Sequence, residues 1–373
     1  MFKSNAALWA EYRDKSRIKL LCQQIAEEYS GPMRIMEVCG THTMSIYHYG
    51  IRSLLPEGLQ LISGPGCPVC VTDEKTVSAA LALAKIPNII FTTYGDMLRV
   101  PAGNTSLQRL RDEGADIRIL LSPLDALELA EQHPERQIVF FAVGFETTAP
   151  LTAATLCRGK EKALQNFSVL CAHKTMPQAL RSLLPGSAVD ALLCPGHVAA
   201  VTGEAFFSFV PQDLKRSAAI AGFEPVDILE AVLAVVRMHA QGGAGLLNCY
   251  PRAVRPEGNP LAMKMMEQVF VPCDAVWRGL GEIADSGLAI GAAYREFDAA
   301  ERFKAEIAAA DCYRDNPACR CGFVLRGECT PEECPCLEKP AHPIIPVGPA
   351  WFPGRGPVLR HISIGGSSNV IYR

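Results

Sequence analysis

The chain has 373 residues, of which 49% are hydrophobic and 20% are charged, so it is long enough for two or three domains with sizeable cores. Its formal net charge of −3 gives no electrostatic reason to expect nucleic acid or an anionic membrane as a partner. No apolar run reaches the roughly 18–20 residues that a membrane span requires, and the first residues lack the apolar core of a signal peptide. We therefore expect a cytoplasmic protein without nucleic-acid or membrane partners.

Short apolar runs of strand length recur along the chain, and helical patterns follow them. The expected strands are 33–38, 59–63, 88–95, 117–123, 137–146, 168–173 and 190–197, and the expected helices include 73–85, 124–132, 147–164 and 227–241. Continuous apolar strands that alternate with helices are typical of a parallel sheet covered on both faces. The expected fold class is α/β, with two parallel-sheet domains in succession and a smaller, mainly helical, Cys-rich domain.

The expected domain boundaries follow from this pattern. A first α/β domain should occupy residues 31–125 and a second residues 126–241, while residues 1–30 and 242–373 should form the third domain. After the second domain the pattern turns mostly helical, and from Cys312 the chain is rich in Cys, Pro and Gly. Such a stretch cannot build a conventional core, so we expect it to need a metal to fold.

Fifteen cysteines are many for a cytoplasmic protein, because thiols stay reduced in that compartment. Clusters of cysteine there more often bind metal or carry out redox chemistry than form structural disulfides. Four cysteines lie in apolar helix or strand patterns and are expected to fill the core: Cys22, Cys157, Cys171 and Cys273. Cys194 and Cys249 lie beside turns, and the sequence leaves their role open.

Five polar motifs follow expected strands. They are CGTHT (39–43), GPGCPVC (64–70), TYGDMLRVP (93–101), GFETTAP (144–150) and CPGHV (194–198). Ligands of open α/β sheets bind beyond the carboxyl ends of the strands. We therefore expect these five loops to converge on one cleft.

The GPGCPVC motif places two thiols three residues apart on a stiff backbone. Pro68 fixes its own φ, and the two glycines permit φ values that other residues rarely adopt. The spacing lets the sulfurs of Cys67 and Cys70 reach one metal ion or each other. A metal site and a redox pair both stay open. A structural zinc site is disfavoured because no second CxxC follows at zinc-finger spacing.

The CGTHT motif combines a thiol and an imidazole. Cys39 and His42 could ligate a metal, or His42 could lower the pKa of the thiol. Alternatively, Thr41 and Thr43 cap the following helix and His42 is solvated. The GPGCPVC motif at the next strand end favours the metal, and three thiolates suit iron or zinc.

Charged side chains and a second imidazole occur in the remaining motifs. Asp96, Arg99 and Glu146 form either a salt bridge between strand-end loops or part of a site. His197 is either a site residue or a turn histidine that bonds the backbone. No Walker loop or GxGxxG fingerprint occurs in the sequence.

Six cysteines crowd the segment 312–336: Cys312, Cys319, Cys321, Cys329, Cys334 and Cys336. In a cytoplasmic protein such a density indicates a metal or iron–sulfur site.

Together with CRCGFVLRG (319–327), the five motifs resemble the signature set of the HypD family, which matures nickel–iron hydrogenases. The resemblance runs from about Arg34 to Cys334. It implies a scaffold on which the hydrogenase iron receives cyanide and carbon monoxide, giving the Fe(CN)2CO group. It also implies a 4Fe-4S cluster, the small chaperone HypC as partner, and HypE as cyanide donor with HypF upstream. The implied role is that of a maturation factor with redox activity, which leaves open whether it counts as an enzyme.

The resemblance also implies roles for single residues. Cys39 would be the iron-binding thiolate, and Cys67 and Cys70 would face it as further ligands or as a redox-active pair. His42 would tune or hydrogen-bond the site, with Asp96, Glu146 and His197 in support. Of the cluster cysteines, Cys321 and Cys334 match the family pattern, and Cys319 and Cys329 are the further candidate ligands. The cluster would exchange electrons with the Cys67/Cys70 pair.

The tail departs from the family pattern after Cys334. Family cysteines would fall where this chain has Ala341, Ala350 and Val358. Two stretches of the tail match what a family tail would encode if its gene were read one base out of frame. We therefore predict that the tail is a frame-shifted reading of an ordinary family tail. Resequencing of the gene tests this prediction.

Two other functions compete with the scaffold. One is a stand-alone cytoplasmic thiol–disulfide oxidoreductase that uses Cys67 and Cys70, with Cys39 as a resolving thiol. The other is a zinc-binding structural module, which the scattered spacing of the cysteines disfavours.

Overall fold

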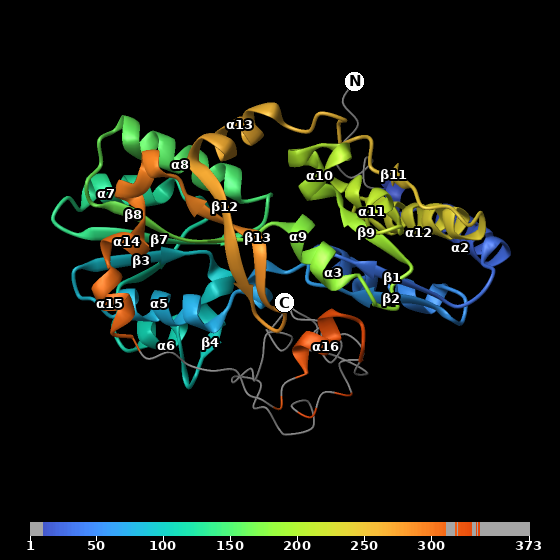
Figure 1. Ribbon diagram of the computed structural model, residues 1–373, viewed down its shortest axis with the longest axis horizontal. Helices are drawn as coiled ribbons and strands as arrows, with labels where there is room; N and C mark the ends of the chain where they lie inside the picture. Colours follow the sequence, from blue (N-terminus) through green and yellow to red (C-terminus); the bar gives the residue numbers. More distant parts are fainter. Residues whose placement is uncertain (1–9, 311–317, 319, 330–332, 334, 336–373) are drawn as a thin grey trace.

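The computed structural model describes residues 10–310, 318, 320–329, 333 and 335. Within these residues, the strands form two parallel sheets of five and four strands and two antiparallel pairs (Figure 1). The expected α/β architecture is therefore confirmed. Of the expected third domain, residues 10–30 and 242–310 are described, whereas most of its Cys-rich tail lies outside the described residues, so the fold of that tail stays a prediction. No helix in the described part of the chain is long and apolar enough to cross a membrane.

The five-stranded sheet has the strand order β11-β10-β9-β1-β2. Its strands are β1 (Met33–Glu37), β2 (Leu59–Ser63), β9 (Ala191–Pro195), β10 (Ser217–Ala221) and β11 (Leu246–Asn248). One face packs on α2 (Lys15–Glu28), α3 (Gly40–His48) and α12 (Pro225–Ala240), and the other on α9 (Met176–Leu183), α10 (Gly196–Thr202) and α11 (Phe209–Gln212). Every residue of β9 and β10 is buried, as expected of strands covered on both faces.

The four-stranded sheet has the strand order β6-β3-β7-β8. Its strands are β3 (Ile89–Thr93), β6 (Ile117–Ile119), β7 (Gln137–Gly144) and β8 (Phe167–His173). One face packs on α5 (Glu74–Ala84) and α6 (Leu107–Asp112), and the other on α7 (Asp125–Gln132) and α8 (Ala149–Glu161). The seven expected strands and four expected helices all occur, with ends shifted by a few residues.

The two sheets are interleaved along the chain. The chain builds β1 and β2, crosses to the other sheet for β3, β6, β7 and β8, and returns to complete the first sheet with β9 to β11. The expectation of two successive sheets is therefore wrong, and the boundary expected at residue 125 falls inside the four-stranded sheet. Apolar strands resemble one another in composition, so their order along the chain does not specify which of them pair.

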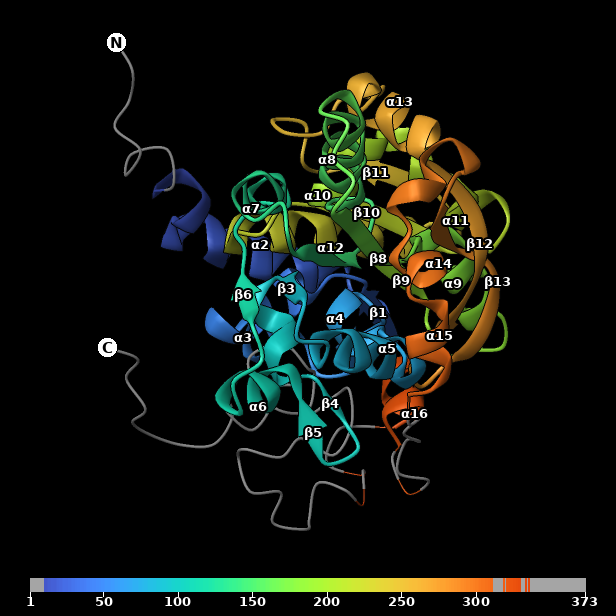
Figure 2. The ribbon, with the colours of Figure 1, turned by 90° about the vertical axis from the view of Figure 1, so that its left-hand side faces the viewer.

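A long antiparallel hairpin, β12 (Phe270–Trp277) with β13 (Gly281–Ile290), occupies a region that was expected to be mostly helical. That expectation is wrong here. The hairpin strands carry exposed polar residues and small residues without a clear two-residue alternation, which hides the strand signal. Figures 1 and 2 show the hairpin beside α9, and bridges join it to Thr72 and Lys174.

The remaining elements are short and connect these layers. They are α4 (Pro68–Val71), α13 (Pro260–Val269), α14 (Ala299–Arg302), α15 (Lys304–Ala308), α16 (Cys321–Leu325), β4 (Pro101–Ala102), β5 (Thr105–Ser106), and the 3-10 helices η1 (Glu11–Arg13), η2 (Ile51–Leu54), η3 (Gly95–Arg99), η4 (Glu204–Phe207) and η5 (Ala292–Phe297). The GPGCPVC motif and α4 lie on the first crossing between the sheets, and α9 lies on the second.

Candidate thiol and metal site

The loop after β2 packs directly on the backbone after β1. The Gly40 N–H donates to the Gly66 carbonyl oxygen at 2.9 Å. A Cβ atom at Gly66 would lie 2.2 Å from the Cys39 nitrogen and 2.2 Å from the Val38 carbonyl carbon, so only glycine fits there. The glycine of the GPGCPVC turn is therefore what allows this motif to reach CGTHT.

Cys67 and Cys70 form a buried pair of thiols. Their side chains are in contact, with the two sulfur atoms 2.7 Å apart, and the residues are 7% and 2% exposed. Both pack in one core with Met97 and Leu98 of the TYGDMLRVP motif. The pair therefore lies where the two sheets meet, with its sulfurs close enough to share a bond or a ligand.

Cys39 precedes the first turn of α3. The backbone N–H groups of Thr41 and His42 hydrogen-bond its sulfur and favour the thiolate, but the surrounding protein has the larger effect and raises the pKa of the thiol. The residue is nevertheless partly exposed. Without a bound cation, we therefore expect Cys39 to stay a protonated thiol that can be reached from outside.

Glu37 hydrogen-bonds the first turn of α3, and none of the sequence motifs includes it. It is 1% exposed, and its carboxylate accepts hydrogen bonds from the Thr43 hydroxyl and, at 3.4 Å, from the Cys39 N–H. A glutamate in an apolar strand gives a usable signal, because a buried charge is rare unless it is bonded.

His42 is fully buried, so the alternative in which its side chain is solvated is wrong. Its Nε2 atom lies 2.9 Å from the Gly222 carbonyl oxygen and therefore carries the proton that it donates. Its Nδ1 atom is buried without a partner among the described residues. Burial lowers the pKa of His42 to about 4, so the ring is neutral at pH 7 with an available acceptor nitrogen.

Phe223 links the loop after β9 to CGTHT. Its ring stacks on His42 at a centroid distance of 4.7 Å and on His197 at 3.8 Å. His197 remains exposed at the start of α10. The fold therefore gathers three of the five expected loops, CGTHT, GPGCPVC and CPGHV, at the carboxyl edge of the five-stranded sheet.

The other two motifs reach this region from the four-stranded sheet. Glu146 is 2% exposed; its Oε1 atom accepts the Met176 N–H at 2.8 Å, and its Oε2 atom has no partner among the described residues. Burial raises the pKa of Glu146 to about 7. Asp96 is half-buried in η3, whereas Arg99 is exposed.

Glu146 predicts a pH dependence of stability. Its pKa is about 7 in the folded state and 4.5 unperturbed, so the folded state holds the proton more tightly. The contribution of Glu146 to the free energy of unfolding is complete below pH 4.5 and is lost as the pH rises to about 7. The loss is at most about 3 kcal/mol. Urea unfolding at several pH values should show this fall in the free energy of unfolding in the native chain and not in Glu146→Gln. Equal slopes in both proteins would contradict the assignment.

The other cysteines have several different environments. Cys194, whose role the sequence left open, is fully buried and fills the core. Cys22, Cys157, Cys171 and Cys249 are partly buried and pack against the hydrophobic cores, whereas Cys273 lies half-buried on β12. Core filling is therefore confirmed for Cys22, Cys157 and Cys171, but not for Cys273. Cys312, Cys319, Cys334 and Cys336 lie outside the described residues.

Helix α16, within the Cys-rich segment, packs against the hairpin and shares a core with Val71. Cys321 begins α16, and Leu325 of this helix shares a core with Val71 and Trp277. A Cβ atom at Gly322 would lie 2.1 Å from the Gly279 carbonyl oxygen, in the turn of the hairpin. Helix α16 and the residues after CPVC therefore both lie against the end of the hairpin.

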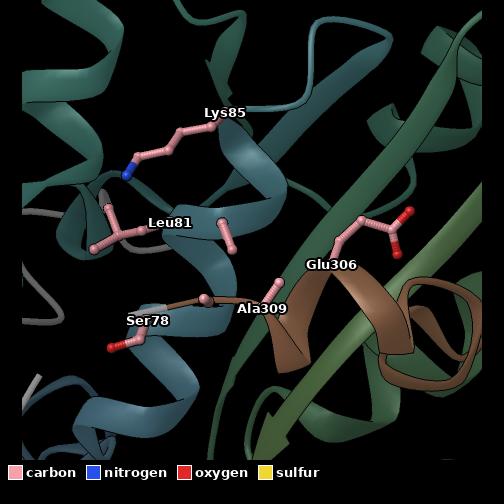
Figure 3. A pocket seen from close by; sticks show the side chains of 7 residues that line it. Ser78, Leu81, Lys85, Glu306 and Ala309 are labelled. Atoms are coloured by element: carbon pink, nitrogen blue, oxygen red, sulfur yellow. The ribbon is translucent and has the colours of Figure 1, made fainter. Parts of the chain in front are cut away.

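A pocket between α5 and α15 is a separate feature (Figure 3). Ser78, Lys85 and Glu306 carry its polar groups, and no thiol or imidazole lines it. Within the described part of the chain, no three or more His, Cys, Asp or Glu side chains converge as a metal site.

These features define an α/β protein in which three thiols lie on adjoining loops where the chain passes between two parallel sheets. The family described as "HypD: Hydrogenase formation hypA family" matches residues 16–356. The chain is 41% identical over 356 residues to hydrogenase maturation factor HypD of Escherichia coli (strain K12), covering 93% of this chain and 95% of that protein. It is 40% identical over 369 residues to the protein of the same name from Rhodobacter capsulatus, covering 96% and 98%. The chain therefore belongs to the HypD family of hydrogenase maturation factors, which confirms the resemblance of its motifs.

Proposed function

We propose that this chain is the scaffold on which the Fe(CN)2CO group of a nickel–iron hydrogenase is assembled. One observation carries the proposal: the Gly66 turn packs the loop that carries the buried pair Cys67 and Cys70 on the backbone of Cys39, whose thiol is accessible. Thiolates are soft, strong donors that suit iron while cyanide and carbon monoxide are added. Membership of the HypD family supports the same chemistry.

Cys39 is the residue that would hold the incoming iron, which is the cargo of the reaction. Binding releases the thiol proton, because the thiolate is the ligand. The N–H groups of Thr41 and His42 then stabilise the sulfur charge. The unpartnered Nδ1 atom of His42 supplies an acceptor for a hydrogen bond from a ligand or water near the metal.

Cys67 and Cys70 would act as a redox pair or as further ligands. In the redox role, a disulfide accepts two electrons and two protons and becomes two thiols. The donor chemistry of the Cys-rich segment fits a 4Fe-4S cluster held by Cys319, Cys321, Cys329 and Cys334, and such a cluster would supply single electrons. The packing of α16 against the hairpin end supports an electron path of this kind.

The partners follow from this role. A HypC-like chaperone would dock over the exposed side of Cys39 and contribute its own cysteine to the iron. HypE would deliver cyanide, with HypF upstream.

Metal analysis separates this function from its rivals. Anaerobically purified protein should contain iron and show cyanide bands in the infrared. Metal-free protein that still exchanges disulfides would favour the stand-alone oxidoreductase, to which the sulfur contact of 2.7 Å is also suited. Zinc in place of iron would favour a structural module.

The thiol pair predicts a difference in thiol count. Oxidation should remove two thiols from the native chain, and thiol titration of the oxidised and reduced forms measures this. Cys67→Ser and Cys70→Ser should each abolish the difference, because either change removes one sulfur of the bond. An equal count in both forms of the native chain would leave the pair as ligands or structural thiols.

A further inference from the structure

Two buried basic residues hold the segment that follows CPVC. Arg278 donates from Nη2 to the Glu74 Oε1 atom at 2.8 Å, and the two side chains are 4% and 12% exposed. The Lys174 ammonium lies 3.9 Å from the Asp73 Oδ2 atom, with side chains 4% and 11% exposed. Asp73 and Glu74 come only three and four residues after Cys70.

Both basic residues are themselves anchored to the hairpin. Lys174 follows β8 and donates to the Val276 carbonyl oxygen at 2.7 Å, while Arg278 follows β12 directly. The Arg278 N–H donates to the Val71 carbonyl oxygen at 2.9 Å. A bridge between Thr72 and Trp277 completes the attachment. Residues 71–74 are thus fixed to a part of the chain two hundred positions away.

We propose that Lys174 and Arg278 are positioning residues that keep Cys67 and Cys70 in contact. The inference rests on the proposed function, in which these thiols act as a pair. Helix α4 has four residues, too few to be stable by itself, so its geometry depends on what holds its ends. The Gly66 turn fixes one end, and the two ion pairs fix the other. The buried, charge-assisted hydrogen bond from Arg278 to Glu74 gives geometric precision, and Lys174 adds an ion pair to Asp73.

The attachment has a chemical consequence. A disulfide forms in proportion to the effective concentration of one thiol near the other. Releasing residues 71–74 lowers this concentration and makes the disulfide less stable, so the reduction potential becomes less negative. A tenfold fall in effective concentration corresponds to a shift of about 30 mV.

Alkylation of the native protein tests the positioning role. In Arg278→Met, iodoacetamide should modify Cys67 and Cys70 about tenfold faster than in the native chain, as read by peptide mass spectrometry. Arg278→Lys, which keeps the charge, should restore most of the protection. Lys174→Met should act in the same direction, and Glu74→Gln serves if Arg278→Met does not fold.

Two controls separate positioning from general destabilisation. Arg136→Met removes an ion pair to Asp116, of 2.7 Å but less buried, beside the four-stranded sheet and should leave both thiols protected. Cys194, which is fully buried, reports global unfolding in every variant. Native alkylation rates in Arg278→Met and Lys174→Met, or a matching rise at Cys194, would overturn the proposal.

The reduction potential of the pair provides the second readout. It should become less negative in Arg278→Met and return toward the native value in Arg278→Lys. If the native chain shows no disulfide couple, the proposed redox role fails, and the alkylation rates still decide the positioning role.

Discussion

Replacing Cys39 with alanine is expected to abolish iron retention and hydrogenase maturation while leaving the fold intact. Cys39 lies in a strand-end loop, is partly exposed, and contributes little to the core. Its sulfur is, in our proposal, the ligand that holds the incoming iron, and no other side chain can replace a thiolate there. Iron content after anaerobic purification and hydrogenase activity in a strain lacking the native gene measure the two losses.

Cys22→Ala is the matched control for this variant. Cys22 is also partly buried, but it lies on α2, away from the three loops that form the site. It should retain both iron and maturation activity. Full maturation by Cys39→Ala would refute the ligand role. Unchanged co-purification with a HypC-like chaperone after the same substitution would show that docking does not require a shared iron atom.

Gly66→Ala is expected to separate the two thiol-bearing loops. The added Cβ atom would lie 2.2 Å from the backbone nitrogen of Cys39, a distance that requires backbone movement. Overpacking of this kind costs about 1–3 kcal/mol. Because the clash is between the two functional loops, we expect maturation to fall to background even where the protein still folds. Thermal unfolding and the complementation assay measure the two effects.

Gly243→Ala provides the control for a glycine substitution. A Cβ atom there meets only the Met238 carbonyl oxygen, at 3.9 Å, which is an ordinary contact. Its stability should stay within about 0.5 kcal/mol of the native chain, and maturation should be retained. A Gly66→Ala protein with native stability and activity would show that the close packing of the two loops is not required.

Much of the fold and part of the site could be predicted from local patterns. The strands before Cys39 and Cys67 are continuous apolar runs, and the loops after them carry thiols, glycine and proline in a short span. Such features are local, so they do not depend on which elements pack together and can be predicted from the sequence. Glu37 was missed because its importance lies in a hydrogen bond to Thr43 that strand periodicity does not reveal.

By itself, the sequence determined where the buried strands run, which polar loops follow them, and that the thiols belong to a HypD-like set of motifs. Only the tertiary structure decided that the sheets interleave, that His42 is buried against Gly222, and that Lys174 and Arg278 hold the residues after Cys70. The physical reason is range. Periodicity and turn chemistry act over a few residues, whereas these contacts join positions about a hundred or more residues apart and depend on which apolar surfaces pack together.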